Sequence, residues 1–367
     1  MKPVIEFLYR LNDGGGIETL IRTYAETMDR NLVSLIVLTL FPNTTSKNHI
    51  AIAQMGIPII SLYPKYNIFF RAVNKVLGKQ ITSFLLKKRI AQLQPCAIHV
   101  HLAKLTYLES IKSSIKNVKL FYTCHCIPHY YLSGRNEKMA AKALINENNL
   151  QVFALHEEMA DELNHLLGIN NTIVIKNGIN IANFRNIKES KQEIRKSLNI
   201  PINAYVVGHV GRFRKVKNHT FLIDIFAQLL QHKNAHLVLV GDGKLLPMIT
   251  DKIKRLGLEK KVTILSHRND INRLLKAFDV FLFPSLHEGT GIALLEAQAA
   301  GLRCIISDTI PNAARVLDTT IAVSLDKSPE YWCNIILNEK LTQAHSAILN
   351  DYDIHQIVKR LQNMYID

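Results

Sequence analysis

Two glutamates, Glu288 and Glu296, flank a glycine-containing loop in the second half of the chain. A buried strand over Val280–Phe283 precedes the loop, and a run of helix formers from Leu294 to Ala300 follows it. Loop amides and the helix dipole favour a phosphate, whereas the two carboxylates would repel phosphate and accept hydrogen bonds from hydroxyl groups. A diphosphate with hydroxyl-bearing groups at both ends, as in a nucleotide-sugar, fits this pattern. The residues between the glutamates at the loop are Gly289, Thr290, Gly291 and Ile292.

A second candidate site follows the predicted strand Tyr205–Val210. Arg212 and Lys217 lie five residues apart where this strand ends. Two cations so placed can hold a diphosphate and stabilise it as a leaving group. Gly243 belongs to a tight turn after the next predicted strand, which brings it to the same sheet edge.

These motifs together resemble the donor site of retaining GT-B glycosyltransferases, of the family 4 type found in bacterial surface-polysaccharide synthesis. The resemblance covers nearly the whole chain and is most evident from Tyr205 to Pro311. It implies that Glu288 contacts hydroxyls of the transferred sugar and that Glu296 contacts the ribose. It also matches Arg212 and Lys217 to a Gly-Arg…Lys-Asn pattern.

The same resemblance points to further site residues. The glycine loop after the first strand, with Gly15 and Gly16, would lie beside the donor phosphates and the acceptor. The loop of Arg268 would pass the base, and His125 would lie close to the donor sugar, where it could hydrogen bond or stabilise charge. His99 and His101 form a second candidate pair at a strand end.

Apolar runs alternate with helical stretches along the chain, which indicates parallel sheets covered on both faces. There are too many strands for one sheet, so we expect two doubly wound, Rossmann-like domains (α/β, GT-B) with a cleft between them. The expected domains are 1–178 and 179–344, and a closing helix at about 345–367 returns to the first. The predicted strands are Ile5–Tyr9, Val33–Leu40, Ile57–Leu62, Ala97–Val100, Val118–Cys124, Leu150–Leu155, Thr172–Ile175, Tyr205–Val210, His236–Val240, Val262–Leu265, Val280–Phe283, Cys304–Ser307 and Ile321–Val323.

Composition narrows the compartment and the chemistry. The 367 residues contain no uncharged apolar run of about 18 residues, and the N-terminus reads as a strand rather than a signal peptide. Five cysteines without a regular framework are typical of reduced thiols in a cytoplasmic protein. Cys124 and Cys126 flank His125, but residues that alternate on a strand point to opposite faces, which disfavours zinc. We expect no metal and no cofactor, because cations and helix N-termini can meet the phosphate charge.

A formal net charge of +15 suggests an acidic partner. Residues 65–90 contain seven basic residues, apolar residues at roughly helical spacing, and no acid. Such a segment suits docking on an anionic membrane. It equally suits an amphipathic helix packed on its own domain with a solvated basic face. No zinc finger or RNA-binding motif occurs, so nucleic acid is not an expected partner.

We therefore expect a cytoplasmic, retaining glycosyltransferase, peripheral on the membrane if residues 65–90 dock there. It would move a sugar from a nucleotide-sugar, with UDP as the expected nucleotide, to a glycan or lipid-linked glycan acceptor. The alternatives are a nucleotide-sugar epimerase on the same fold and a non-catalytic sugar-nucleotide-binding subunit. The chain departs from the resembled pattern in three places: at Thr290-Gly291-Ile292 in the donor loop, where members of the family also vary, at Asn180, where Asp is usual, and at Ser266-His267, where a glycine is usual.

Overall fold

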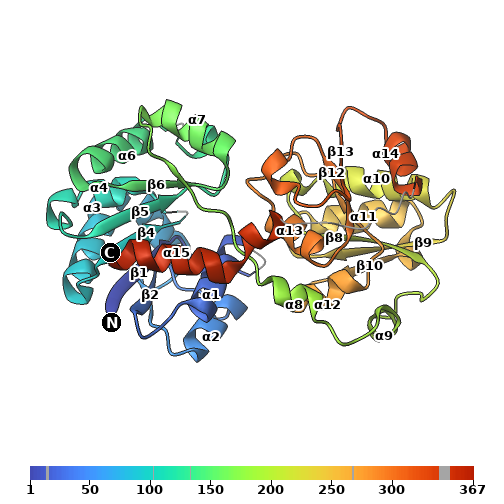
Figure 1. Cartoon of the computed structure of the whole chain (residues 1–367), viewed down its shortest axis with the longest axis horizontal. Coiled ribbons are helices and arrows are strands. Elements are labelled where there is room, and N and C mark those ends of the chain that lie inside the picture. Colours follow the sequence, from blue (N-terminus) through green and yellow to red (C-terminus); the bar gives the residue numbers. More distant parts are fainter. Residues whose placement is uncertain (14–15, 102, 133, 267, 339–347) are drawn as a thin grey trace. The chain divides into compact units, whose positions relative to one another are not determined.

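The computed structural model describes residues 1–13, 16–101, 103–132, 134–266, 268–338 and 348–367. Within these ranges the chain divides into two compact units, each with its own parallel sheet (Figure 1). Unit 1 comprises Met1–Gly178 and Ile354–Asp367, and unit 2 comprises Ile179–Asp353. Each unit therefore carries its own core and is described by itself.

Among the described residues, unit 1 is built on a seven-stranded sheet in the order β3-β2-β1-β4-β5-β6-β7. The order reverses between β1 and β4, which makes the carboxyl ends of these two strands the place where a ligand is expected in such a sheet. The strands are β1 Lys2–Leu8, β2 Val33–Thr39, β3 Ile59–Ser61, β4 Ala97–Val100, β5 Lys119–Thr123, β6 Gln151–Ala154 and β7 Ile173–Val174.

Helices join the strands of unit 1 and cover its sheet (Figure 1). The longest of those described is α3, which begins at Ile68 after the N-cap residue Asn67, whose side chain accepts a hydrogen bond from the Phe70 amide. The helices are α1 Gly16–Thr27, α2 Lys47–Gln54, α3 Ile68–Leu93, α4 Leu105–Glu109, α5 Pro128–Tyr131, α6 Arg135–Asn148, α7 Glu157–Leu167 and α15 Ile354–Ile366.

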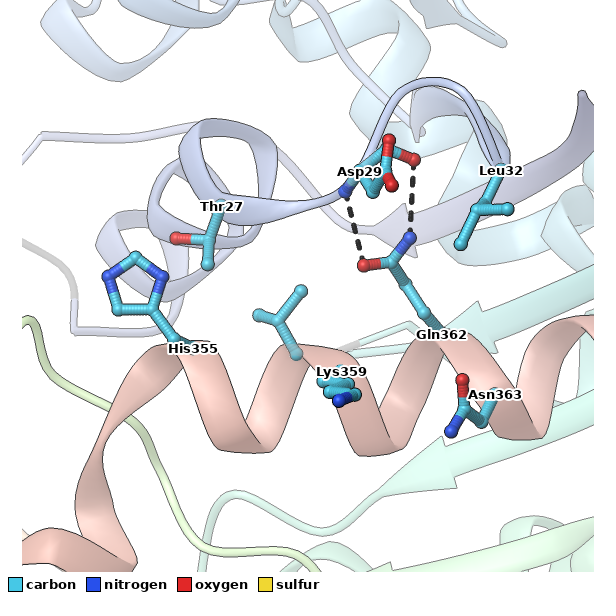
Figure 2. A pocket seen from close by; sticks show the side chains of 8 residues that line it. Thr27, Asp29, Leu32, His355, Lys359, Gln362 and Asn363 are labelled. Carbon is cyan, nitrogen blue, oxygen red and sulfur yellow. Dashed lines mark hydrogen bonds between the residues drawn. The ribbon is translucent and has the colours of Figure 1, made fainter.

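The last helix, α15, belongs to unit 1 although it comes at the end of the chain. Figure 2 shows how it is held: the Gln362 amide pairs with the backbone of Asp29, just after α1. The Asp29 N–H donates to Gln362 Oε1 over 3.1 Å, and Gln362 Nε2 donates to the Asp29 carbonyl over 3.2 Å. Beside this pair lies a hollow that His355 and Lys359 also line. These two hydrogen bonds hold α15 beside the C-terminal end of α1.

Unit 2 contains a six-stranded sheet within the described ranges, in the order β10-β9-β8-β11-β12-β13. Its order reverses between β8 and β11, where Val280 is the register partner of Val207 and Phe281 that of Gly208. The strands are β8 Tyr205–Val210, β9 Ala235–Val240, β10 Val262–Leu265, β11 Val280–Phe283, β12 Arg303–Ser307 and β13 Thr320–Val323.

Two hydrophobic cores cover the two faces of this sheet. Alternate residues of one strand go to opposite cores, so Leu282 packs with α10, α11 and α14, whereas Phe281 and Phe283 pack with α9, α12 and α13. The helices are α8 Ile181–Arg185, α9 Lys191–Ser197, α10 His219–Leu229, α11 Leu246–Arg255, α12 Ile271–Lys276, α13 Ile292–Ala299 and α14 Pro329–Leu337.

The strands expected from the sequence all occur, and four of them have the expected bounds. These four are Ala97–Val100, Tyr205–Val210, Val262–Leu265 and Val280–Phe283. The prediction of two doubly wound α/β units is confirmed.

Close packing at Gly208 of β8 gives a stability prediction. A Cβ at this position would lie 1.9 Å from Cδ2 of Phe278, which is fully buried. We expect Gly208→Ala to lower the free energy of unfolding by about 3 kcal/mol through overpacking. Urea unfolding followed by fluorescence of Trp332, the single tryptophan and part of the unit 2 core, measures it.

Gly257→Ala is the matched control, because a Cβ there meets nothing within 4 Å and the cost is only that of its left-handed backbone, about 1 kcal/mol. Equal losses in the two variants would contradict the packing argument.

Candidate functional site

In unit 2, the loops after β8 and β11 meet at the reversal point of the sheet. Lys217 Nζ lies 2.6 Å from Glu288 Oε1, and both side chains are mostly buried. The same ammonium lies 4.6 Å from the ring centre of Phe283, the last residue of β11. The Leu286 amide donates to the Val216 carbonyl over 2.8 Å, which ties the two loops together. The structure thus brings together two predicted site residues that are 71 positions apart.

The loops after β8 and β9 are also joined. The Phe213 amide, next to Arg212, donates to the Asp242 carbonyl over 2.9 Å, and the Phe213 carbonyl accepts from the Leu245 amide over 3.1 Å. Gly243 lies against this backbone, and a Cβ on it would be 2.6 Å from the Phe213 oxygen. Arg212 and Gly243 therefore belong to one rigid pair of loops.

Helix α13 begins directly beside the Lys217–Glu288 pair. Gly291 occupies the N-cap position with φ +70°, a conformation that glycine adopts without strain. Thr290 is buried, and Gly289 and Ile292 are partly buried. The first amides of α13 have no partner within the helix and carry the positive end of its dipole. Glu296, in the second turn, is also partly buried.

Arg268 lies in the loop after β10 and is paired with Asp270. Its Nε donates to Asp270 Oδ1 over 2.8 Å, and its Nη2 to Oδ2 over 2.5 Å. Asp270 is the N-cap residue of α12, but its side chain makes no capping hydrogen bond. Both carboxylate oxygens of Asp270 instead accept hydrogen bonds from Arg268.

Two buried histidines behind the β8 loop were not anticipated from the sequence. His209 Nδ1 hydrogen bonds to the Leu282 carbonyl at 2.9 Å, and the His219 ring stacks on Phe213 with centroids 4.4 Å apart. Burial lowers the pKa of His209 well below its usual value and that of His219 to about 4, and Lys217 adds to both shifts. Both rings are therefore neutral at neutral pH, which leaves the charge of this half-site to the lysine, arginine and glutamates.

In unit 1, His125 follows β5 and ends a chain of buried polar side chains. His125 Nε2 lies 2.7 Å from His101 Nδ1, and His101 Nε2 lies 2.6 Å from Glu6 Oε2. His125 Nδ1 is buried and has no hydrogen-bond partner among the described residues. His101, which the sequence offered as an alternative to His125, is thus its partner. Gly16 is the first residue of α1, and Gly15 and His267 lie outside the described residues.

The same cluster contains the ligand atoms of a conceivable metal site. Single ligand atoms of Glu6, His99 and His101 lie within 4.8 Å of one another. However, zinc bonds of about 2.0–2.2 Å in a tetrahedral site hold ligand atoms more than about 3 Å apart. The 2.6 Å contact between Glu6 and His101 is instead a hydrogen bond. Burial raises the pKa of the Cys124 thiol to about 12, and its Sγ lies 3.1 Å from the Cys126 carbonyl.

Glu6 and Tyr365 were missed by the sequence analysis. Glu6 lies in the otherwise apolar stretch Val4–Leu8 of β1, and a carboxyl group in a fully buried parallel strand requires partners. That exception in an apolar run was the available signal. Tyr365 lies in α15, and no pattern in the sequence links it to β1.

Family models match both halves of the chain. The model of the family Glycosyltransferase Family 4 matches residues 14–183, and that of Glycosyl transferases group 1 matches residues 190–324. These two matches, one in each half of the chain, confirm the predicted resemblance to GT-B glycosyltransferases of the family 4 type.

Relatives share part of the sequence. The chain is 33% identical over 207 residues to the putative glycosyltransferase EpsF of Bacillus subtilis, covering 52% of each protein. It is 29% identical over 215 residues to an Escherichia coli UDP-Gal:alpha-D-GlcNAc-diphosphoundecaprenol alpha-1,3-galactosyltransferase, covering 53% of this chain and 54% of the relative. The chain spans about half the length of these curated relatives.

Solved structures show the fold over the full length. HepE of Anabaena, in complex with UDP and glucose, superposes with a TM-score of 0.78 at 20% identity and covers 99% of both chains. WaaG, a glycosyltransferase involved in lipopolysaccharide biosynthesis, gives a TM-score of 0.72 at 16% identity, covering 99% of both chains. At these identities the likeness extends to the fold alone.

The buried His219 makes unit 2 sensitive to acid. The unfolded chain protonates this histidine near pH 6.5, whereas the folded protein resists protonation down to about pH 4. The unfolded state thus binds more protons in this window, and stability is lost as the pH falls. We expect His219→Phe to reduce the loss of unfolding free energy between pH 7 and pH 5 by about 2 kcal/mol. Urea unfolding followed by Trp332 fluorescence at both pH values measures it.

The exposed His232 provides the control, because His232→Phe should leave the pH dependence of wild type. If His219→Phe showed the wild-type loss, the histidine would not be held neutral by the fold.

Proposed function

We propose that this chain is a retaining glycosyltransferase that takes a sugar from a UDP-sugar. The observation that carries the proposal is the contact of Lys217 with Glu288 where β8 and β11 diverge, beside the start of α13. The contact gathers a cation, a carboxylate and helix-terminal amides into one small volume. That combination suits a ligand with both phosphate and hydroxyl groups.

Each residue has a distinct task in this proposal. Arg212 and Lys217 bind the diphosphate and stabilise the charge that develops on it as it leaves. The amides from Gly289 to Ile292 add uncharged donors to the same phosphates. Glu288 accepts hydrogen bonds from hydroxyls of the transferred sugar, and Glu296 accepts them from the ribose. Gly243, in the loop after β9, and Arg268, in the loop after β10, contact the nucleotide.

The choice of UDP and of an acceptor on a lipid follows from the relatives. HepE is described with UDP and glucose, and the Escherichia coli relative is named for a UDP-galactose donor and a diphosphoundecaprenol acceptor. In unit 1 we assign His125 to the sugar end of the donor and Gly16 to the loop beside the phosphates. An epimerase or a non-catalytic subunit would use the same donor loops, and the release of UDP separates these functions.

The exposed side chains of helix α3 support the proposal that the protein binds such an acceptor at a membrane surface. Phe69, Val76 and Phe84 lie along one face, at i, i+7 and i+15, and are 64%, 76% and 68% exposed. The opposite face is buried in the unit 1 core through residues such as Leu86 and Ile90. The seven basic residues expected to face an acidic partner are all exposed: Lys65, Arg71, Lys75, Lys79, Lys87, Lys88 and Arg89.

The packing of α3 on unit 1 matches the amphipathic-helix interpretation, and docking on a membrane is a proposal for its outer face. Phe70 packs against the core, as the amphipathic-helix interpretation requires, while Phe69 and its neighbours on the outer face remain exposed. None of the described helices is long and apolar enough to cross a bilayer. We propose that the outer face of α3 inserts its apolar side chains at the level of anionic headgroups, where its cations pair with lipid.

The donor assignment predicts different effects for the two partners of the ion pair. Lys217→Ala should lower turnover about 100- to 1,000-fold, as removal of one preorganised donor does, and should weaken UDP binding. Glu288→Gln keeps the size of the side chain and should lower turnover while UDP binding persists. Release of UDP from a panel of UDP-sugars measures turnover, and the thermal shift induced by UDP measures binding.

Lys215→Ala is the matched control, because Lys215 is exposed in the same loop and should tolerate the change. Wild-type turnover in Glu288→Gln would refute the assignment of this carboxylate. Interconversion of UDP-sugars without UDP release would identify an epimerase, and UDP-sugar binding without turnover a binding subunit.

The membrane assignment predicts a loss of binding when the charge on the outer face of α3 is changed from positive to negative. Lys75, Lys87 and Lys88 together replaced by Glu should abolish sedimentation with anionic vesicles in low salt, because each cation near such a surface contributes about 1 kcal/mol. Lys79 is left in place because its ammonium lies 3.1 Å from Glu109.

The control replaces three exposed lysines of unit 2, Lys196, Lys254 and Lys260, by Glu, which changes the net charge equally. Equal loss of sedimentation in both triple variants would show that net charge, rather than α3, governs binding. Retention of the α3 variant would contradict docking through this helix.

A further inference from the structure

The buried chain Glu6–His101–His125 has the geometry of a tautomer relay. Its links measure 2.6 Å and 2.7 Å, and its last nitrogen, His125 Nδ1, is the member without a partner among the described residues. Glu6 and His101 are completely buried. An unpartnered polar atom in such a place costs free energy unless a ligand satisfies it.

Because His101 is neutral, the two hydrogen bonds that join Glu6, His101 and His125 must run in the same direction. Burial lowers the pKa of His101 to about 3, so its ring is neutral and has one N–H and one lone pair. Both ring nitrogens are hydrogen bonded, one to Glu6 and one to His125. If one nitrogen donates, the other must accept. A reversal at the Glu6 end therefore reverses the link to His125.

The two directions give His125 opposite hydrogen-bonding properties. When Glu6 is ionised, His101 Nε2–H donates to it, His101 Nδ1 accepts from His125 Nε2–H, and His125 Nδ1 is left with a lone pair. When Glu6 is protonated, its O–H donates to His101 Nε2, and His101 Nδ1–H donates to His125 Nε2. His125 Nδ1 then carries a hydrogen and is a donor.

Glu6 lies in surroundings that allow both states near neutral pH. Burial raises its pKa to about 8, and the hydrogen bond from Tyr365 partly opposes this rise. The groups that face it are His99 of β4, His101 directly after β4, Tyr365 of α15 and Tyr24 of α1. Tyr365 Oη donates to Glu6 Oε1 over 3.1 Å, which leaves Oε2 for His101.

Residues beside Glu6, His101 and His125 hold these side chains in place but are not part of the relay. His99 Nδ1 lies 2.6 Å from Tyr365 Oη and His99 Nε2 lies 2.7 Å from Thr123 Oγ1, so this ring holds the tyrosine. The Gln362 clamp on Asp29 holds α15, one turn before Tyr365 (Figure 2). The C-terminal helix thus completes the surroundings of a carboxyl group in the first strand.

We propose that Glu6, acting through His101, sets whether Nδ1 of His125 donates or accepts a hydrogen bond toward the sugar donor. Glu6 and His101 are then positioning residues for His125, an assignment that rests on the proposed function. Below about pH 8 the relay presents an N–H, which can bind a hydroxyl or phosphate oxygen of the donor. Above that pH it presents a lone pair, and the bond to an acceptor oxygen is lost.

The direct test is the tautomer of His125, read by ¹⁵N-detected imidazole spectra of the full chain between pH 6 and pH 9.5. In the wild type, His125 Nδ1 should change from protonated to unprotonated as the pH passes about 8. Glu6→Gln should hold Nδ1 protonated throughout, because the amide N–H₂ donates to His101 as the neutral acid does. A wild-type tautomer that does not change, or one that changes equally in Glu6→Gln, would overturn the relay.

Turnover against pH gives the functional readout. Wild-type turnover should fall at least about tenfold between pH 7 and pH 9.5, and Glu6→Gln should keep its turnover over that range. Tyr365→Phe, which also removes a buried hydrogen bond, should move the alkaline fall to higher pH, because the bond it removes favours the ionised carboxylate. A purely structural role would weaken both variants without moving their pH profiles in these directions, and this result would overturn the proposal.

The two experiments separate the relay from the proposed function. A tautomer change without any UDP release would leave the relay standing and refute the transferase. Spectra recorded with and without added ZnCl₂ address the metal alternative. Loss of the His99 and His101 N–H signals on zinc addition would overturn the relay in favour of a metal site.

Discussion

Parallel pairing of β8 with β11 is the constraint on which the candidate donor site of unit 2 depends. The order of the sheet reverses between these strands, so the connections from their carboxyl ends leave toward opposite sides. A gap opens there that only loops can fill. The β8 loop fills it with Lys217 and the β11 loop with Glu288, and their 2.6 Å contact closes it. Arg212, Gly243 and the start of α13 are placed by the same geometry.

Unit 1 repeats this constraint with different chemistry. Its sheet reverses between β1 and β4, and Glu6 is the register partner of His99 across that pair. Here the polar groups lie within the strands and just beyond them rather than further along the loops. The fold therefore has to satisfy them internally, and it does so with histidines, Thr123 and a tyrosine from α15. Charged side chains thus lie at the reversal point of unit 2, whereas neutral, hydrogen-bonded rings lie at that of unit 1.

Much of this architecture could be predicted from the sequence, for a physical reason. Strands buried on both faces are continuous apolar runs, so Val280–Phe283 and Tyr205–Val210 could be delimited without knowledge of their partners. Site residues next to such strands, such as Lys217 and Glu288, follow from the rule that ligands bind at strand carboxyl ends. The pairing of Arg268 with Asp270 could not be predicted, because a helix cap and an ion pair compete for the same carboxylate.

Contacts over long sequence separation were beyond that analysis for another reason. Tyr365 reaches Glu6 across 359 positions, and no periodicity in either element encodes the contact. Similarly, the exposed face of α3 could not be told from its buried face, because both carry apolar residues such as Phe69 and Phe70. Only the packing of the helix on its sheet decides which aromatic ring remains outside.

The contrast between the polar clusters of the two units follows from the energy of charge in a protein interior. A strongly basic chain can place Lys217 in a loop of unit 2, where the contact with Glu288 offsets the desolvation of its ammonium group. An imidazolium at the depth of His101 would be far more costly, and burial keeps that ring neutral. A shift of tautomers along neutral rings carries the state of Glu6 to His125 without placing a cation on either ring. Buried histidines can therefore transmit information through a core in which a mobile charge would not be tolerated.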